Sequence, residues 1–189
     1  SIISGANGMG INADNVVIDG FTIQDQTTVN SGPGFGYAVY MAPPRTGTQL
    51  LNNIIKNNVI GSSLANTGVS QAIISCNWFD SNNNPGPSSG AGIYSDEYTG
   101  GGIISNVLID NNKFSGHVND GGIDISTSQA AFAATGITIT NNEFSGNRRA
   151  AFLYNTVSSS FSNNVISGST GAGSGELRIF GGVNNLSVM

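Results

Sequence analysis

The chain has 189 residues, of which 38% are hydrophobic and only 9% are charged, and its formal net charge is −5. This length favours one domain with its own hydrophobic core. Six Lys and Arg residues are too few for the clustered basic surface of a nucleic-acid-binding protein. No apolar run approaches the roughly 20 residues of a membrane-spanning helix. We therefore expect neither nucleic acid nor a membrane span.

A short motif recurs along the chain, with two corner residues, one further residue and then a large apolar residue. Its copies are KNNVIGS (56–62), DNNKFSG (110–116), TNNEFSG (140–146) and SNNVISG (162–168). Apolar residues alternate with polar ones on both sides of each pair, a pattern typical of two short strands that meet at a tight corner. Repeats of about 20–50 residues indicate a solenoid.

Each coil is predicted to contain three strands, which we call the first, second and third in chain order. The segment 1–8 matches the third strand of a coil, with Ile3 pointing inward. The first full coil then has a first strand over 10–14, a second strand around Ile18 and a third strand around Ile23. Later first strands are predicted over 38–42, 63–67, 92–96, 122–126, 152–156 and 177–181. Their inward residues, beginning with Ile11, are Val39, Leu64, Ile93, Ile123, Phe152 and Leu177. The last six residues match a second strand, with Val188 pointing inward.

The second and third strands flank the corner pairs. The predicted inward residues of the second strands are Ile18, Ile55, Ile74, Ile109, Ile139 and Phe161, and those of the third strands are Ile23, Ile60, Phe79, Phe114, Phe144 and Ile166. Glycine-rich stretches over 30–36 and 82–90 are predicted as corner loops, and 128–135 as one or two helical turns.

The corner residues have a structural explanation. The first pair members, Gly20, Asn57, Cys76, Asn111, Asn141 and Asn163, are mostly of the types that tolerate a left-handed backbone. A side-chain amide both donates and accepts hydrogen bonds, and coils of a solenoid repeat every 4.7–4.9 Å or so. We therefore predict a structural asparagine ladder at the corner between second and third strands, formed by Asn58, Asn77, Asn112, Asn142 and Asn164.

The NN-x-F/I-x-G corners and the I-x-I strands before them resemble the right-handed parallel β-helix superfamily, the pectin-lyase-like group with its short β-helix repeats. The resemblance covers essentially the whole chain. It implies an all-β, right-handed parallel β-helix of about six complete coils of three strands. It does not imply an activity, because one fold serves many functions.

Neither end of the sequence contains an evident cap, and solenoids need caps to cover their end coils. We expect a single β-helix domain over 1–189 that is a segment of a longer solenoid. The alternative is a unit that stacks head to tail on copies of itself and forms a filament.

The same resemblance implies that a polysaccharide would bind along the outer face of the first sheet. The outward column predicted there is Asn12, Tyr40, Ala65, Tyr94, Asp124, Leu153 and Arg178. The candidate groove residues are Tyr40 and Tyr94, which could stack on sugar rings, and Asp96, Asp124, Glu176 and Arg178, which could bond hydroxyls or carboxylates.

Metal and catalytic chemistry have fewer candidates. Asp96–Glu97 and Asp120–Asp124 are the best acid pairs for calcium or for proton transfer. They supply too few oxygens for calcium, so we expect no metal and no cofactor, with calcium as the open alternative. No reactive constellation is recognisable, which favours a protein that is not an enzyme.

Several single residues have a default interpretation. We expect Cys76 to be small and half-buried, His117 to be solvated, and Arg148 and Arg149 to lie at a solvated corner. Trp78 points outward in the third strand, and we expect a corner loop to cover it; the alternative is an interface or a sugar platform.

The combined prediction is an extracellular or cell-surface β-solenoid with a structural or adhesive role that binds glycan along its first sheet. The alternatives are a fragment of a polysaccharide lyase, hydrolase or epimerase of the pectin-lyase-like group, and a filament subunit.

Overall fold

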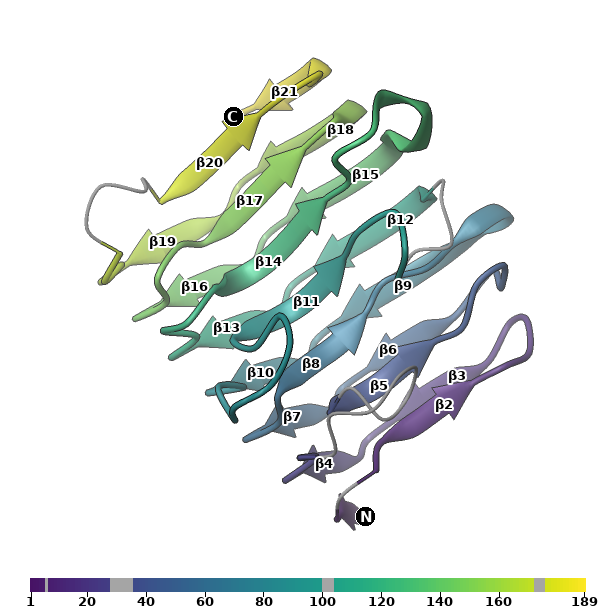
Figure 1. Cartoon of the computed structure of the whole chain (residues 1–189), viewed down its shortest axis with the longest axis vertical. Coiled ribbons are helices and arrows are strands. Elements are labelled where there is room, and N and C mark those ends of the chain that lie inside the picture. Colours follow the sequence, from purple (N-terminus) through teal and green to yellow (C-terminus); the bar gives the residue numbers. More distant parts are fainter. Residues whose placement is uncertain (6, 28–35, 100–103, 172–175) are drawn as a thin grey trace.

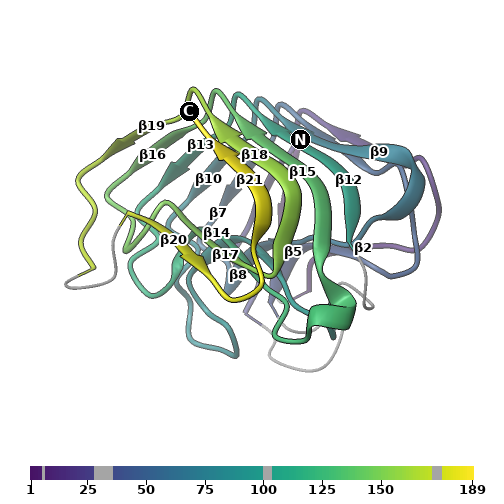
Figure 2. The same ribbon diagram turned by 90° about the horizontal axis from the view of Figure 1, so that it is seen from above.

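The chain folds as a right-handed parallel β-helix (Figure 1). The computed structural model describes residues 1–5, 7–27, 36–99, 104–171 and 176–189. Three parallel sheets contain seven strands each, and successive strands of the chain pass from one sheet to the next. Seen from above, the coils superpose into one column (Figure 2). The predicted fold class is thus confirmed.

The first sheet contains β2 (Met9–Ile11), β5 (Tyr37–Met41), β8 (Ile60–Ser63), β11 (Ala91–Ser95), β14 (Gly121–Ser126), β17 (Ala151–Tyr154) and β20 (Leu177–Phe180). The second contains β3 (Val17–Asp19), β6 (Gln49–Leu51), β9 (Thr67–Ser75), β12 (Ser105–Asp110), β15 (Ala134–Thr140), β18 (Thr156–Ser162) and β21 (Asn184–Val188). The third contains β1 (Ile2–Ser4), β4 (Thr22–Gln24), β7 (Ile54–Lys56), β10 (Trp78–Asp80), β13 (Lys113–Ser115), β16 (Glu143–Ser145) and β19 (Val165–Ser167).

The core is built by stacking like residues in register. In the third sheet the inward column is Ile3, Ile23, Ile55, Phe79, Phe114, Phe144 and Ile166. The rings of Phe79 and Phe114 are 5.0 Å apart and nearly parallel, and those of Phe114 and Phe144 are 4.9 Å apart. This stacking buries apolar area on every coil, which is the main favourable term in folding.

A column of amides runs inside the corner between the second and third sheets. The Asn77 amide nitrogen donates to Oδ1 of Asn112 at 3.0 Å, and Asn112 donates in the same way to Asn142. Asn53 precedes Asn77 in this column, and Asn164 follows Asn142. From Asn77 onward, each Oδ1 also accepts the backbone N–H of the preceding asparagine, and Oδ1 of Asn53 accepts that of Phe21. The column therefore satisfies corner groups that have no partner in the sheets.

The prediction for residues 52–60 is wrong in register. Asn58 lies at the next corner, between the third and first sheets, and Asn53 occupies the predicted place of Asn58. Accordingly Ile55 points inward from the third sheet, and Ile60 begins the first-sheet strand β8. The reason is that both corners use a left-handed residue followed by an inward amide, as Asn52–Asn53 and Asn57–Asn58 do.

The second corner has its own buried column, in which Asn58, Asn82, His117 and Asn147 follow one another. His117 is fully buried there. The expectation of a solvated His117 is therefore wrong, because its ring takes the place of an amide between two asparagines. Burial lowers the pKa of His117 to about 4.

The first-sheet predictions are correct in some strands and shifted in others. Ile93 and Ile123 pair as expected, but Asp124 pairs with Phe152. Phe152 therefore shares the outer face with Asp124, and Leu153 is buried. Two further shifts are of two residues and keep the same face: Met9 rather than Ile11 pairs with Val39, and Ser62 rather than Leu64 pairs with Ile93.

The remaining expectations concern local structure. One 3-10 turn, Ala130–Phe132, forms within the predicted helical stretch. Residues 82–90 connect β10 to β11 as a corner loop, whereas 30–35 lie outside the described residues. Ile3 pairs with Ile23, and Val188 pairs with Phe161, as predicted. In the part of the chain that is described, no helix combines the length and hydropathy of a membrane crossing.

Candidate functional site

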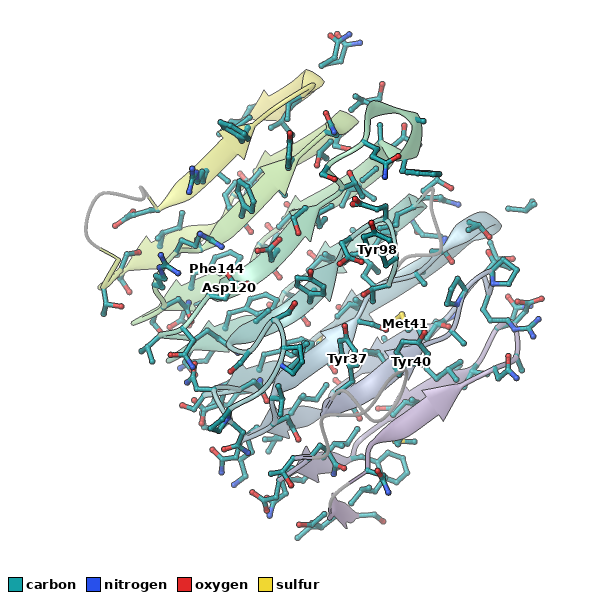
Figure 3. The ribbon with its side chains drawn as sticks, viewed as in Figure 1. Tyr37, Tyr40, Met41, Tyr98, Asp120 and Phe144 are labelled. Carbon is teal, nitrogen blue, oxygen red and sulfur yellow. The ribbon has the colours of Figure 1, made fainter. Side chains whose placement is uncertain are left out.

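The outer face of the first sheet presents a column of aromatic and charged side chains. Tyr94 on β11, Asp124 on β14, Phe152 on β17 and Arg178 on β20 are successive register partners. They point away from the core because they alternate with buried residues such as Ile93 and Ile123. Figure 3 places Tyr37, Tyr40, Tyr98 and Asp120 over this sheet.

The N-terminal half of this face contains an apolar cluster with a pocket beside it. Tyr37, Val59, Ile60 and Ala91 are buried together, and Tyr40 and Tyr94 pack against them. The pocket has a volume of about 180 Å³. We call it the tyrosine pocket; the lining residues used below are Tyr37, Ile60, Tyr94, Asp96, Tyr98 and Thr99.

Asp96 organises the wall of the tyrosine pocket. Its Oδ2 accepts the Tyr94 hydroxyl at 2.8 Å, and its Oδ1 accepts the backbone N–H groups of Tyr98 and Thr99 at 3.0 and 2.6 Å. These bonds hold the loop after β11 against the sheet. The Tyr98 side chain is 80% exposed, so one aromatic ring of the pocket is open to solvent.

The hydroxyls of Tyr37 and Tyr94 remain protonated at neutral pH. Burial is the main cause that raises the pKa of both Tyr37 and Tyr94, and the charge of Asp96 adds to it. The Tyr37 and Thr99 hydroxyl oxygens are 3.4 Å apart. The pocket thus combines aromatic surface with neutral hydroxyls and one carboxylate, the groups that proteins use to hold a polyhydroxylated ring.

Farther along the column lies a buried ion cluster. The Arg149 guanidinium binds Asp120 through Nη2, and the same nitrogen is 3.2 Å from Oδ2 of Asp124. Arg149 is 7% exposed and Asp124 is 5% exposed. The expectation of a solvated Arg149 is wrong, because the two carboxylates draw its side chain over the sheet.

Burial raises the pKa of Asp124, and the neighbouring charge of Asp120 raises it further, while Arg149 opposes both effects. Oδ1 of Asp124 and Nε of Arg149 are buried and lack a hydrogen-bond partner among the described residues. A carboxyl of raised pKa is the usual requirement for a proton donor. Here, however, its unbonded oxygen has no contact with solvent.

The C-terminal part of the face is formed by rings and guanidinium groups. Arg149 lies 4.9 Å and Arg178 lies 5.3 Å from the centre of the Phe152 ring, and Arg178 is 5.7 Å from that of Phe180. Such stacking fixes a guanidinium while leaving its donors available. Arg178 is exposed and forms no ion pair with a described residue, so it can meet an external carboxylate.

The structure unites most of the predicted groove residues. Tyr94 and Asp96 line the tyrosine pocket, and Tyr40 packs against the apolar cluster beside it. Asp124 and Arg178 lie farther along the same face. Glu176 is exposed just before β20, and no side-chain hydrogen bond or ion pair joins it to a described residue.

Sequence reasoning missed Tyr37, Tyr98, Phe152 and Arg149 as members of this face. The run AAFLYN gave one signal, because it can alternate in either of two registers. Tyr37, by contrast, shares its strand parity with the inward Val39, so no period-two pattern could place it outside.

The candidate acid pairs for calcium have other partners. Glu97 accepts hydrogen bonds from the Ser128 hydroxyl and backbone N–H at 2.5 and 2.9 Å, and the hydroxyl bond is the main cause that lowers its pKa. Asp120 is engaged by Arg149. Among the described residues, no group of three or more His, Cys, Asp or Glu side chains is arranged to hold a metal ion.

The exposure of three further residues can be compared with the prediction. Trp78 is 40% exposed, which corrects the expectation that a loop covers it, and Cys76 is exposed rather than half-buried. Arg148 is exposed as expected, and its Nη1 donates to the Asn119 carbonyl at 3.0 Å.

No family model matches the chain, and no curated protein matches it. Two solved structures of the surface adhesin PfbA of Streptococcus pneumoniae share 19% and 20% sequence identity with it, with TM-scores of 0.46 and 0.47. The alignments cover 90% of this chain but only 47% and 45% of those chains. The chain thus spans about half the length of these proteins.

Proposed function

We propose that this chain is a glycan-binding segment of a cell-surface or extracellular adhesive β-solenoid. The glycan chain lies along the outer face of the first sheet and inserts one ring into the tyrosine pocket. The observation that carries the proposal is this pocket, about 180 Å³ in volume, in which tyrosine rings, neutral hydroxyls and Asp96 converge on the outer face of the first sheet.

The shape of the face supports an extended ligand. The tyrosine pocket and the Phe152–Arg178 stack lie on the same outward column, with the Arg149 ion cluster between them. Coils are about 4.8 Å apart, so this column offers successive contacts to a polymer aligned with the helix axis. Because the strands of the sheet are already ordered, little conformational entropy is lost when the ligand binds.

The charge pattern favours an acidic sugar at the C-terminal contact. Arg178 is an exposed cation at that end, and the rings of Phe152 and Phe180 hold its guanidinium. A guanidinium matches a carboxylate in geometry as well as charge. A chain with a uronic or sialic acid unit would pair with Arg178 while a neutral ring fills the tyrosine pocket.

Glycan-array binding of the purified chain tests this proposal. We expect retention of acidic glycans, a loss of about tenfold or more in affinity for Tyr94→Ala, and a loss of preference for acidic chains in Arg178→Ala. Lys56→Ala is the matched control, because it removes the same charge from the third sheet. Unchanged binding in Tyr94→Ala would refute the proposed site.

A cell-surface location is a separate part of the proposal. Antibodies against the chain should label intact source cells, and brief protease treatment of those cells should remove the labelling. Labelling that requires permeabilised cells would contradict it.

The enzymatic alternative, a fragment of a polysaccharide lyase, hydrolase or epimerase, is supported by one feature, the raised pKa of Asp124 beside Arg149. It is disfavoured by the burial of Asp124 and its unbonded oxygen. Product release from polyuronates that is lost in Asp124→Asn would establish it over simple binding.

A further inference from the structure

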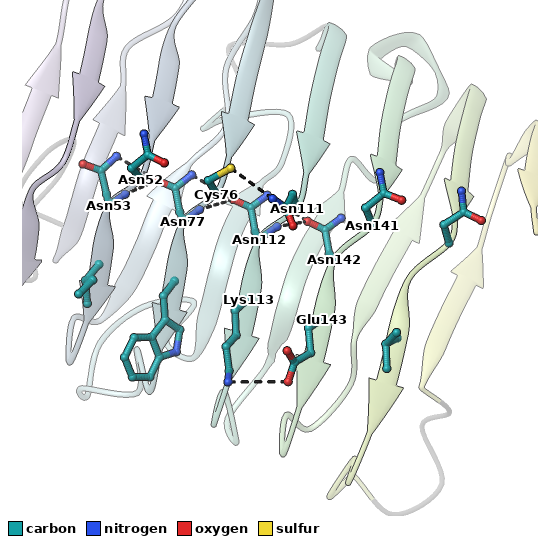
Figure 4. A pocket seen from close by; sticks show the side chains of 14 residues that line it. Asn52, Asn53, Cys76, Asn77, Asn111, Asn112, Lys113, Asn141, Asn142 and Glu143 are labelled. Carbon is teal, nitrogen blue, oxygen red and sulfur yellow. Dashed lines mark hydrogen bonds and ion pairs between the residues drawn. The ribbon is translucent and has the colours of Figure 1, made fainter.

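A second groove runs along the corner between the second and third sheets. It has a volume of about 590 Å³ and spans several successive coils (Figure 4). In cross-section this corner lies on the opposite side of the coil from the first sheet (Figure 2). The groove is therefore separate from the tyrosine pocket and from the ion cluster.

One side of the groove is formed by the left-handed residues of the corner. Their φ angles lie between 53° and 59°, and they are Asn52, Cys76, Asn111, Asn141 and Asn163. The inward asparagines belong to the buried column, whereas these outer ones are exposed. One exposed residue per coil gives this side a spacing of about 4.8 Å.

The outer amides are oriented by bonds to neighbouring side chains. The amide nitrogens of Asn52 and Asn141 donate to Asp19 and Asp110 at 2.9 and 2.8 Å, and that of Asn111 donates to Sγ of Cys76 at 3.3 Å. Because the nitrogens are engaged, the Oδ1 atoms are left for solvent, and no described residue donates to them. The groove thus offers carbonyl acceptors in a row.

The other side of the groove is the outward column of the third sheet, which consists of Ile54, Trp78, Lys113, Glu143 and Val165. Trp78 is fixed in place, because its Nε1 donates to the Ser115 hydroxyl at 2.8 Å and that hydroxyl donates to Asp80 at 2.8 Å. The Trp78 side chain is thus held in one orientation while 40% of the residue is exposed. It provides a preorganised surface on which a ligand can stack.

The charges of the groove cancel. Lys113 and Glu143 form an exposed ion pair at 3.7 Å, and the Lys113 ammonium lies 5.8 Å from the centre of the Trp78 ring. The other lining residues are asparagines, apolar residues and Cys76. A lining without net charge favours an uncharged ligand over an acidic or basic one.

We propose that this corner groove is a second binding site, which takes a neutral polysaccharide chain aligned with the axis of the β-helix. One sugar ring stacks on Trp78, and hydroxyls of successive units donate to the outer Oδ1 atoms of Asn111 and Asn141. The length of a pyranose unit is close to the coil spacing, so neighbouring units meet equivalent acceptors. The proposal does not depend on the first-sheet site, whose C-terminal contact carries a free cation.

Intrinsic fluorescence reports directly on the groove, because Trp78 is the only tryptophan of the chain. The probes are a soluble glucan, a mannan and a galactan, each titrated into the purified chain, with a polyuronate as the charged comparison. We expect a saturable change in tryptophan emission with at least one neutral polysaccharide. Affinity electrophoresis in gels containing that polysaccharide gives the affinity of variants that lack the indole.

Trp78→Ala should weaken the binding about tenfold or more, since aromatic contacts dominate such sites. The double variant Asn111→Gly with Asn141→Gly keeps the left-handed backbone but removes two acceptors, and a loss of a few fold is expected. Arg148→Ala, at an exposed position outside both proposed sites, should bind as the unaltered chain does, and all variants should unfold cooperatively.

The proposal is overturned if none of the neutral polysaccharides changes the emission of Trp78. It is equally overturned if Trp78→Ala binds with unchanged affinity, or if Tyr94→Ala abolishes the binding. In the last case the ligand would occupy the first sheet instead.

Discussion

His117 Nε2 lies 3.1 Å from the amide nitrogen of Asn82, and its Nδ1 lies 2.9 Å from Oδ1 of Asn147. Since the Asn82 amide nitrogen is a donor, Nε2 must accept and Nδ1 must carry the proton. Both ring nitrogens are then satisfied in the neutral form, and a second proton at Nε2 would face the donor group of Asn82. The histidine thus continues a column of amides only while it is uncharged.

The first prediction concerns pH. Burial lowers the pKa of His117 from its ordinary 6.5 to about 4. Between those values the unfolded state binds more protons, so the free energy of unfolding decreases as pH falls from about 6.5 to about 4, by about 3 kcal/mol in total. His117→Asn should show a smaller decrease in urea unfolding experiments at several pH values. An equal decrease in both proteins would contradict this role.

The second prediction concerns the Arg149 ion cluster. Arg149→Ala leaves Asp120 and Asp124 close together without a cation, and we expect a loss of about 3–5 kcal/mol in the free energy of unfolding at neutral pH. The loss should be smaller in acid, where the carboxyls are protonated. Arg148→Ala, the exposed neighbour, should change stability by no more than about 0.5 kcal/mol. Similar losses in both variants would be inconsistent with the cluster.

The third prediction concerns the buried amide column. Asn112→Ala removes the acceptor of the Asn77 backbone N–H and the donor to the Ile74 and Asp110 carbonyls. Because unsatisfied buried groups are costly, we expect a loss of about 3 kcal/mol. Asn164→Ala, at a half-buried position, should cost about 1 kcal/mol. Chemical denaturation measures both, and a reversed order would show that burial does not govern the column.

The fourth prediction concerns Cys76, which occupies a left-handed position with φ of 59°. Asn tolerates this conformation better than Cys does, so Cys76→Asn should raise the free energy of unfolding by about 1 kcal/mol. Its Oδ1 can also replace Sγ as the acceptor of the Asn111 amide. Cys76→Ala keeps the strain and should give no gain. Equal stability of the two variants in thermal and urea unfolding would speak against backbone strain at this corner.

The local pattern around each corner was sufficient to predict the architecture. Ile109, Asn112 and Phe114 have the same relation as Ile139, Asn142 and Phe144, and both sets stack in register as expected. A parallel solenoid makes this possible, because each residue meets its own equivalent on the next coil rather than a distant partner.

The sequence could not distinguish the two corners of the third sheet. Asn52–Asn53 and Asn57–Asn58 share one chemistry, a left-handed residue followed by an inward amide. Only the stacking of Ile55 between Ile23 and Phe79 decides which pair belongs to which corner. His117 was misjudged for the same reason, since its place in an amide column depends on Asn82 and Asn147 in other coils.

For the candidate sites, the sequence by itself determined that Tyr94, Asp124 and Arg178 face outward on one sheet, because alternation in a strand is a local property. Only the tertiary structure decided that Arg149 reaches back over that sheet, that Tyr98 closes a pocket with Asp96, and that Trp78 remains uncovered. These features depend on where loops from neighbouring coils come to lie. The physical reason is that the packing of a loop is fixed by contacts between coils, which a period-two pattern does not encode.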